Sequence, residues 1–351
     1  MRLQKLPTIS VAVPAYSRAI ELCDLIDSVL NGNALPDELL IVEDNSPERN
    51  EIRSVVERYK KKFDSVGCIL SYLENDVNLG YDGNLRKSIE ESTSDYVIVL
   101  GNDDALLPNA IKEVKSYIVD NPNVNFISRT YSRFSEKTTN IINTTWLSKS
   151  DTIFDLNNSS SGFVFRLCGF VGGLIVNRNW AKSVSTESYD GTLYYQYYLA
   201  CLAFLDRGVG YISEPIALGR ADNPPLFGSA ASENEVHIPG SYTPKGRAKM
   251  WSGILRITSD VDRIYHVNLF DGIKKELSHR QSFHIFEMMP LQGRKATLSL
   301  FNELRKIGLT SDWLPCLLVI YILIFGKYAS LGFSAFRQFQ FVFEKNIKLK
   351  L

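Results

Sequence analysis

The sequence predicts an α/β fold, a mainly parallel sheet flanked by helices, followed by a mostly helical C-terminal region. Apolar, strand-like runs recur through the first 130 residues, and stretches with apolar residues at helical spacing separate them. Strands that alternate with helices in this way favour a parallel sheet with crossover helices. The chain has 351 residues, 45% of them hydrophobic, which is enough to bury a sizeable core.

Five segments have the composition of buried strands. They are residues 8–13, 38–42, 68–73, 96–100 and 124–128. A helical pattern follows each of the first four segments, and a polar residue of the kind that caps helices stands near the first three helix starts. We therefore expect Ser17, Ser46 and Asp82 to cap these helices, and Pro108 to begin the fourth.

The rest of the chain is less regular. Residues 135–160 are rich in Ser, Thr and Asn and are expected to form an exposed excursion, whereas residues 193–205 have a helical pattern. Residues 220–246 contain four prolines and several glycines, which indicates a loop. The expected domains are an α/β domain over 1–230, with halves at about 1–130 and 160–223, and a helical, basic region over 240–351.

Charge is unevenly distributed, although the chain has 39 basic and 39 acidic residues. From Gly240 to the end there are 17 Lys or Arg and 8 Asp or Glu. Such a basic region favours an anionic partner such as lipid headgroups or nucleic acid, and a solvated charged face is an equal alternative. It includes the apolar run Leu314–Phe325, which is shorter than the roughly 20 residues of a spanning helix. This run is either an interfacial helix or a buried one.

Cysteine usage predicts a reduced, cytosolic protein. The chain has an odd number of cysteines, five, and they are widely spaced, lie among apolar residues and form no C-x-x-C pair. The N-terminal residues MRLQKLPTISVAV do not have the pattern of a signal peptide.

Polar residues follow three of the predicted strands, at 14–16, 43–46 and 102–104. Parallel sheets bind ligands beyond the carboxyl ends of their strands, so these segments are expected to form one site. Asp103 and Asp104 are adjacent carboxylates whose mutual repulsion a bound divalent cation would relieve. The alternative is that they only precede a helix N-terminus, where acidic residues are favoured. Asp44 could accept hydrogen bonds from a nucleobase or ribose, or could be a turn residue. P-loop and dinucleotide-binding motifs are absent, and the four histidines lack metal-ligand spacing.

Three blocks of the sequence form a recognisable pattern: ISVAVPAYSR at 9–18, LLIVEDNSP at 39–47 and NLGYDGNLRKSIEESTSDYVIVLGNDDALLP at 78–108. In this order and spacing they resemble the inverting family 2 nucleotide-sugar glycosyltransferases of the GT-A fold. The resemblance is good over about 6–130 and fades through 160–223, where GGLIVNRNW and ISEPIALGRADN are similar to O-antigen transferases such as the abequosyltransferases. Many members have Asp at the position of Gly101, so this chain departs from the family pattern there.

The resemblance implies roles for individual residues. Asp103 and Asp104 match the acidic pair that holds Mg²⁺ or Mn²⁺ on the donor diphosphate, and Asp44 would contact the base of the nucleotide. The implied nucleotide-sugar contacts are Pro14, Tyr16, Arg18, Asp44, Asn78, Asp82, Asp103 and Arg220. Family members also have a downstream carboxylate as general base, for which Asp190 is the first candidate and Glu187 the second. A solvated loop carboxylate is the alternative for both.

The resemblance thus implies a glycosyltransferase that moves a sugar, with inversion, from a nucleotide-sugar donor to a hydroxyl of a glycan. The expected acceptor is a lipid-linked oligosaccharide of O-antigen or capsule-type biosynthesis, and no nucleic acid partner is expected. We expect a cytoplasmic protein, peripheral on the inner face of the cytoplasmic membrane through its C-terminal region. The alternatives are a catalytically inactive nucleotide- or sugar-binding module and a sugar-1-phosphate nucleotidyltransferase, for which PAYSRAI lacks the Gly-rich, Arg-containing loop.

Overall fold

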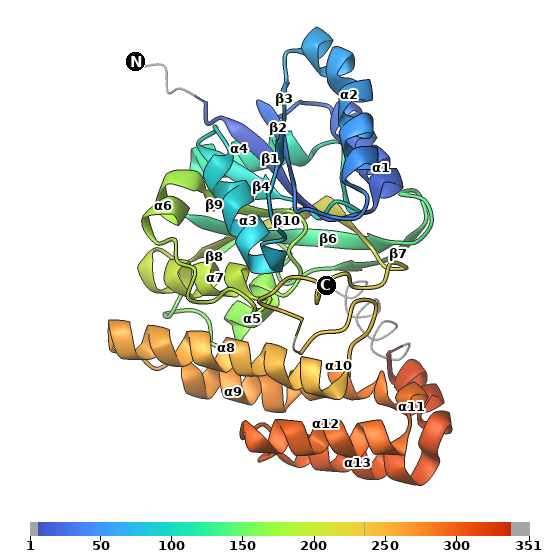
Figure 1. The fold of residues 1–351 in the computed structure, drawn as a ribbon. Helices are drawn as coiled ribbons and strands as arrows, with labels where there is room; N and C mark the ends of the chain where they lie inside the picture. The colour runs from blue at the N-terminus through green and yellow to red at the C-terminus, as the bar shows by residue number, and fades with distance from the viewer. Residues whose placement is uncertain (1–5, 235, 338–351) are drawn as a thin grey trace.

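A ten-stranded, mainly parallel sheet with helices on both faces forms the upper part of the molecule, and a group of helices lies below it (Figure 1). The structure is a computed structural model and describes residues 6–234 and 236–337. This architecture confirms the predicted α/β fold class with a helical C-terminal region. Within the described residues, the predicted helical region 240–351 is helical as far as Arg337, and the remainder of that range lies outside them.

The strands follow the order β3-β2-β1-β4-β9-β6-β10-β5, with β7 paired to β6 and β8 to β10. Strands β1 to β4 are mutually parallel, and β9 enters antiparallel between β4 and β6. The strands are β1 (Ile9–Ala15), β2 (Glu38–Glu43), β3 (Ile69–Glu74), β4 (Tyr96–Val99), β5 (Ala105–Leu106), β6 (Phe126–Phe134), β7 (Ile141–Thr145), β8 (Thr152–Phe154), β9 (Leu174–Asn177) and β10 (Val209–Arg220). All five predicted strands are present, four of them within two residues of the expected bounds, whereas β6 continues to Phe134, six residues beyond the predicted end.

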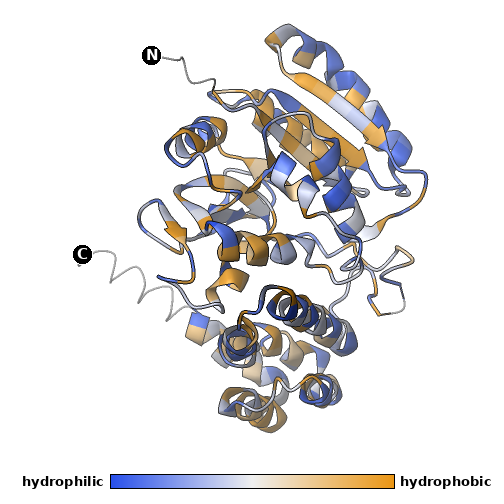
Figure 2. Ribbon diagram, turned by 90° about the vertical axis from the view of Figure 1, so that its left-hand side faces the viewer, coloured by the Kyte–Doolittle hydropathy of each residue, from blue (hydrophilic) through white to orange (hydrophobic). Residues whose placement is uncertain are grey.

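Alternate residues of the strands pack into two hydrophobic cores, one on each face of the sheet. Val11 and Val13 of β1 pack with α1, α2 and α4 on one face, whereas Ala12 packs with α3, α5 and α7 on the other. Figure 2 shows apolar residues concentrated along the strands and on the helix sides that face them. These helices are α1 (Ala19–Leu30), α2 (Arg49–Val66), α3 (Gly80–Glu91), α4 (Ala110–Asp120), α5 (Phe163–Cys168), α6 (Arg178–Ser183) and α7 (Tyr195–Asp206).

The C-terminal helices share the second core with the sheet. Trp251 and Ile254 of α8 belong to the same buried cluster as Tyr197 of α7, and this cluster continues to Leu318 and Ile322 of α13. The lower helices therefore do not form a separate core. They are α8 (Pro244–Tyr265), α9 (Phe270–Ser278), α10 (Arg280–Phe286), α11 (Met289–Gln292), α12 (Arg294–Lys306) and α13 (Trp313–Phe325), followed by the 3₁₀ turn Gly326–Tyr328.

Three of the predicted helix caps are wrong. The N-cap positions of α1, α2 and α3 are Arg18, Glu48 and Leu79, and none makes a side-chain cap bond. Ser17 has a left-handed φ of 53°, and the hydroxyl of Ser46 has no hydrogen-bond partner in the described structure. Glu48 takes over for α1, because its carboxylate accepts the backbone N–H of Ala19 over 3.0 Å.

The expected excursion over 135–160 is also more ordered than predicted. It contains β7 and β8, which extend the sheet at β6 and β10. All five cysteines are free.

Candidate functional site

Three polar segments meet at one edge of the sheet, as the sequence predicts. β1 lies between β2 and β4 and is parallel to both, so the strands before residues 14–18, 43–46 and 101–104 end together. Pro14 and Tyr16 are half-buried there. We call these three segments the strand-end site.

The backbone of the strand-end site is strained at three non-glycine residues. Ser17, Arg18 and Asn45 have φ values of 53°, 63° and 53°. Such conformations persist only where surrounding contacts hold them, and they cluster at functional sites. The buried carboxylate of Glu43 holds the second turn by accepting the backbone N–H of Asn45 over 3.0 Å and of Ser46 over 2.6 Å. The side-chain amide of Asn102 donates to the Ser17 carbonyl over 2.6 Å and so ties β1 to β4.

Asp44 is buried under the start of α3. Its carboxylate accepts the side-chain amide of Asn75 over 2.7 Å and the backbone N–H groups of Leu79 and Gly80 over 2.8 and 3.0 Å. Burial raises the pKa of Asp44 to about 6, although these hydrogen bonds lower it. The side-chain oxygen of Asn78 accepts the same Gly80 N–H over 2.9 Å. Asp44 and Asn78 therefore position α3, and their contact with a nucleotide stays a prediction.

Asp103 and Asp104 lie side by side in different environments. The Asp103 side chain is 13% exposed, and its Oδ2 atom accepts from Arg18 over 2.7 Å and from Asn223 over 2.9 Å. Asp104 is 5% exposed and accepts the backbone N–H of Arg220 over 3.1 Å. Burial, followed by the neighbouring charge of Asp103, raises the pKa of Asp104 to about 7. Asp103 is therefore the more accessible of the two carboxylates.

Two glycines make room for the Asp104 carboxylate. A Cβ atom would lie 2.8 Å from Oδ2 of Asp104 if placed on Gly101, and 2.3 Å from it if placed on Gly172. Both distances are shorter than atoms in a packed interior tolerate. The departure from the family pattern at Gly101 therefore fits the position that Asp104 takes in this chain.

A basic and aromatic group that sequence reasoning missed lies beside this acidic pair. Arg129, Tyr131 and Arg133 alternate along β6, and the rings of Tyr131 and Phe170 have centroids 4.5 Å apart. The Arg129 guanidinium is buried and stacks on both rings at 5.1 Å. The positive charges of Arg133 and Arg129 favour the ionised form of Asp104. The Arg129 guanidinium donates to the backbone carbonyls of Gly172 and Phe170, each over 2.8 Å, and neither arginine forms an ion pair within the described part of the chain. The Arg-x-Tyr-x-Arg alternation could have revealed this group.

The segment between β10 and α8 folds over the strand-end site. The side-chain amide of Asn223 contacts Asp103, and the carbonyl of Pro224 accepts from Arg18. Glu233 is buried and accepts the backbone N–H of Tyr81, in the first turn of α3, over 2.7 Å. The sequence indicates a loop here but gives no signal of these contacts.

Arg220 contacts the backbone of the acidic pair. Its Nε atom donates to the backbone carbonyl of Asp103 over 3.2 Å, and its guanidinium pairs with Asp24 over 2.7 Å and stacks on Phe134 at 4.7 Å. The predicted contact of Arg220 with the diphosphate is not tested by this arrangement and stays a prediction.

Asp82 joins α3 to α7. Its buried carboxylate accepts the backbone N–H of Leu193 over 2.7 Å and of Tyr195 over 2.9 Å. Burial raises the pKa of Asp82 to about 7. The predicted cap of α3 is thus a cap of α7, and a role of Asp82 in nucleotide-sugar binding stays a prediction.

The two candidate bases share one arginine. Arg86 of α3 donates to Oδ2 of Asp190 over 2.8 Å and lies 3.4 Å from the carboxylate of Glu187. Oδ1 of Asp190 is buried and has no hydrogen-bond partner among the described residues, and burial raises the pKa of this carboxyl. Glu187 is 82% exposed. A positioned carboxylate with a raised pKa and one free oxygen suits a general base, so the geometry favours Asp190.

The acidic pair fits a divalent cation that is shared with a substrate phosphate. Mg²⁺ is usually held by one or two carboxylates together with phosphate oxygens. Among the residues that the structure describes, no group of three or more His, Cys, Asp or Glu side chains could form an all-protein cage. The raised pKa of Asp104 also reflects a like-charge repulsion that a cation would relieve.

A mainly parallel α/β sheet, with an acidic pair and several arginines beyond its strand ends, is the arrangement that the resemblance to GT-A glycosyltransferases predicts. The family model "Glycosyl transferase family 2" matches residues 10–174, which assigns this part of the chain to that family. Over the matched residues the chain is a family 2 glycosyltransferase, which confirms the class implied by the sequence resemblance.

Individual relatives are distant. Abequosyltransferase RfbV of Salmonella typhimurium is 27% identical over 228 residues, which are 61% of this chain and 67% of that protein. The GalNAc(5)-diNAcBac-PP-undecaprenol beta-1,3-glucosyltransferase of Campylobacter jejuni is 29% identical over 30% of this chain, and the match spans only 33% of that protein. The crystal structure of residues 1–349 of S. aureus TarS in complex with UDP-GlcNAc superposes with a TM-score of 0.58 at 14% identity, covering 94% and 92% of the two chains. The last likeness shows the fold.

Proposed function

We propose that this chain transfers a sugar, with inversion, from a nucleotide-sugar donor to a hydroxyl of a glycan acceptor, with the help of Mg²⁺ or Mn²⁺. The observation that carries the proposal is the pair Asp103 and Asp104 at the strand ends, with Arg18 paired to Asp103 and with Arg129 and Arg133 acting on the charge of Asp104. Neighbouring aspartates in a buried setting are unfavourable in the free protein, which is typical of a site that is completed by its ligand.

The acidic pair and the arginines would contact different parts of the donor complex. Asp103 and Asp104 would hold the cation, which when bound supplies Lewis-acid stabilisation of the departing nucleoside diphosphate. Arg18 lies 2.7 Å from Asp103 and reaches the same region, where its planar guanidinium suits diphosphate oxygens. Arg129 and Arg133 add positive charge from β6, which strengthens diphosphate binding and opposes its loss to solvent.

Asp190 is the residue that we assign to proton removal. In an inverting displacement the acceptor oxygen bonds to the anomeric carbon while the bond to the diphosphate breaks, and the acceptor proton passes to a base. The partnerless Oδ1 of Asp190 would receive that proton, while Arg86 holds Oδ2 in place over 2.8 Å. Such a base contributes about 10²–10⁴-fold to the rate.

The acceptor is inferred from the relatives. One is named as an abequosyltransferase and another as a glucosyltransferase that acts on an undecaprenol-linked glycan. These names support a lipid-linked oligosaccharide acceptor in O-antigen or capsule-type polysaccharide biosynthesis. The inner face of the cytoplasmic membrane stays a prediction of the sequence.

Hydrolysis or transfer from a panel of UDP-, GDP-, CDP- and dTDP-sugars, with Mn²⁺ and with EDTA, tests the proposal. We expect turnover of at least one donor that EDTA abolishes and that Asp103→Ala lowers at least ~100-fold, as loss of a Lewis acid worth several kcal/mol requires. Metal-dependent nucleotide binding without any turnover would instead identify a catalytically inactive binding module.

A further inference from the structure

Helix α13 carries an exposed apolar stripe. Trp313, Leu317, Ile320 and Ile324 are 64%, 51%, 54% and 63% exposed. Their spacing of four, three and four residues places them on one side of α13. The opposite side faces the core through Pro315, Leu318, Val319 and Ile322. A contiguous exposed stripe, unlike single exposed apolar residues, marks an interaction surface.

The stripe continues beyond α13 and onto its neighbour. Phe325 at the end of α13 is exposed, as are Tyr328 and Leu331 after it, and Leu298 of the adjacent α12 is also exposed. Figure 1 places α12 and α13 at the bottom of the molecule, below the other C-terminal helices. The apolar surface is therefore at one end of the molecule and away from the strand-end site.

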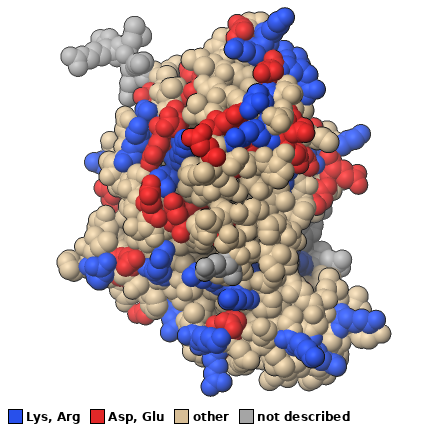
Figure 3. Space-filling model, in the orientation of Figure 1, with Lys and Arg blue, Asp and Glu red and all other residues tan. Residues whose placement is uncertain are grey.

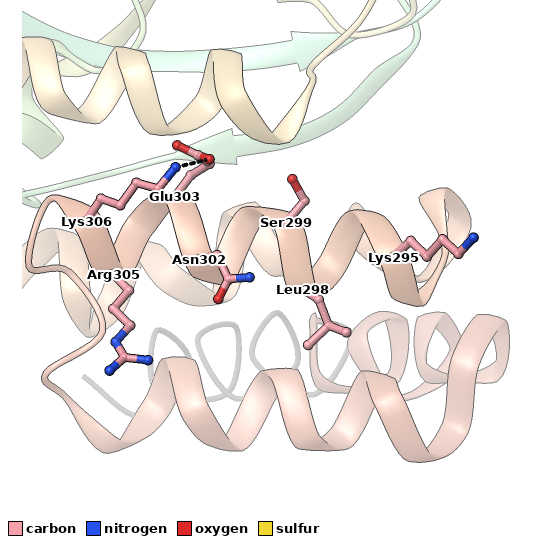
Figure 4. A pocket seen from close by; sticks show the side chains of 7 residues that line it. All are labelled: Lys295, Leu298, Ser299, Asn302, Glu303, Arg305 and Lys306. Carbon is pink, nitrogen blue, oxygen red and sulfur yellow. Dashed lines mark hydrogen bonds and ion pairs between the residues drawn. The ribbon is translucent and has the colours of Figure 1, made fainter.

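Exposed basic side chains stand on α12, which packs against α13, and in the turn after α13, and we call them the basic rim. Arg294, Lys295, Arg305, Lys306 and Lys327 are all exposed. Figure 4 shows a hollow along α12 that is lined by residues including Lys295, Leu298 and Arg305, with α13 next to it. Figure 3 shows Lys and Arg gathered over the lower end of the molecule, with few acidic residues.

The two acidic residues of this region already interact with other groups of the protein. Between Met289 and Arg337 the sequence has only Glu303 and Asp312 as acids. Glu303 pairs with Lys306 over 2.6 Å, and Asp312 caps α13 by accepting the backbone N–H of Leu314 over 3.1 Å. The exposed surface of the region therefore has a net positive charge next to its apolar stripe.

The segment Trp313–Arg337 is long and apolar enough to cross a membrane by length and composition, and only 28% of its most apolar window is buried. Its geometry, however, is not that of a straight spanning helix. α13 ends at Phe325 and is about 20 Å long, against about 30 Å of hydrocarbon. At Gly326 the backbone leaves the helix with a φ of 55°. The chain then folds back, because the rings of Tyr321 and Phe333 lie 5.8 Å apart.

We propose that α13 lies in the plane of an anionic lipid bilayer, with the stripe Trp313, Leu317, Ile320 and Ile324 in the interface and the basic rim on the headgroups. α13 is apolar on all sides, with one face in the core and the other exposing Trp, Leu and Ile, and the basic side chains come from α12 and from the turn after α13. An exposed apolar face next to Lys and Arg is an arrangement that binds such surfaces. A second copy of the chain is a poorer partner, because a symmetric contact would bring the two basic rims together. The inference is independent of the donor chemistry of the strand-end site.

Co-sedimentation with vesicles of phosphatidylglycerol and phosphatidylethanolamine tests the proposal, with phosphatidylcholine vesicles as the neutral control. We expect the full chain to bind the anionic vesicles at low salt and to dissociate at high salt. The double variant Ile320→Glu, Ile324→Glu should bind at least about tenfold more weakly. Ile69→Glu, Val77→Glu, which adds the same two charges at exposed sites far from α13, is the matched control and should bind like the wild type.

Charge and fluorescence provide two further readouts. Lys295→Gln and Arg305→Gln should each weaken binding about fivefold, whereas Lys61→Gln on α2 should not. A blue shift of tryptophan emission on vesicle addition should disappear in Trp313→Phe.

Absence of binding to anionic vesicles at low salt would overturn the proposal, and so would equal binding by wild type and the Ile320→Glu, Ile324→Glu variant. A lipid-free dimer in light scattering that this variant dissociates, without vesicle binding, would assign the face to a second copy instead. Donor hydrolysis measured without vesicles should be the same in wild type and variant. This readout, together with the thermal melting curve, separates a failure of docking from misfolding and from failure of the proposed function.

Discussion

Replacing Asp104 by asparagine should stabilise the free protein at alkaline pH while removing metal-dependent activity. The carboxylate of Asp104 is 5% exposed, and its only described hydrogen bond is the backbone N–H of Arg220. An asparagine side-chain oxygen can accept the same N–H group. The substitution therefore removes a buried charge and keeps the contact that the structure shows.

The magnitude follows from the pKa of Asp104, which burial raises from 3.8 to about 7. At pH 8 this difference corresponds to about 4 kcal/mol of stability lost by ionising the group in the folded state. Arg133 and Arg129 interact favourably with the charge and would be lost as partners. We therefore expect asparagine to add about 1–4 kcal/mol to the free energy of unfolding, or several degrees in melting temperature.

The sign of the pH dependence is fixed by linkage. An acid whose pKa is higher in the folded than in the unfolded chain binds more protons when folded, so the protein gains stability as pH falls from above 7 towards 4. The advantage of Asp104→Asn over the wild type should therefore shrink over that window. Thermal melts of the metal-free protein at several pH values measure it, with the exposed Asp64→Asn as control. A variant that is less stable at pH 8, or equally stabilised at all pH values, would refute the reasoning.

Four further variants test the site. Asp103→Ala should lower metal-dependent donor turnover at least ~100-fold in a steady-state assay with an unchanged melting temperature, and wild-type rates would remove its assignment as metal ligand. Asp190→Asn should lower kcat about 10²–10⁴-fold, whereas Glu187→Gln should remain within about threefold, and the reverse order would exchange the two candidate bases. Gly101→Asp, which restores the common family residue, should destabilise the fold by about 1–3 kcal/mol in a denaturant titration, because its Cβ would lie 2.8 Å from Asp104; equal stability would show that the carboxylate can move aside.

The sheet could be predicted because each strand and its crossover helix form a unit of about 30 contiguous residues with its own apolar periodicity. The same locality explains why the amino-acid sequence alone places the polar strand ends at Pro14, Asp44 and Asp103 together. β9 is not evident as a separate strand in the sequence, since its place between β4 and β6 depends on antiparallel pairing to partners far away along the chain.

The parts that sequence does not reveal are long-range polar contacts. The local pattern favours Ser17 as a cap, yet Glu48 from another segment satisfies the N-terminus of α1. The pattern also favours Asp82 as a cap of α3, but its carboxylate binds the start of α7, more than a hundred residues away. Asn223 and Glu233 reach the strand-end site from a segment whose sequence indicates only a loop. Hydrogen-bonding side chains accept many partners, so local pattern alone does not select among them.

Calorimetric titration of nucleotide sugars, with Mn²⁺ and after addition of EDTA, tests the central claim most directly. The claim is that Asp103 and Asp104 bind the diphosphate of an activated sugar through a divalent ion. It predicts saturable binding of at least one UDP-, GDP-, CDP- or dTDP-sugar that EDTA abolishes and that is absent in Asp103→Ala. Binding that survives both treatments, or no binding of any donor to a folded protein, would contradict it.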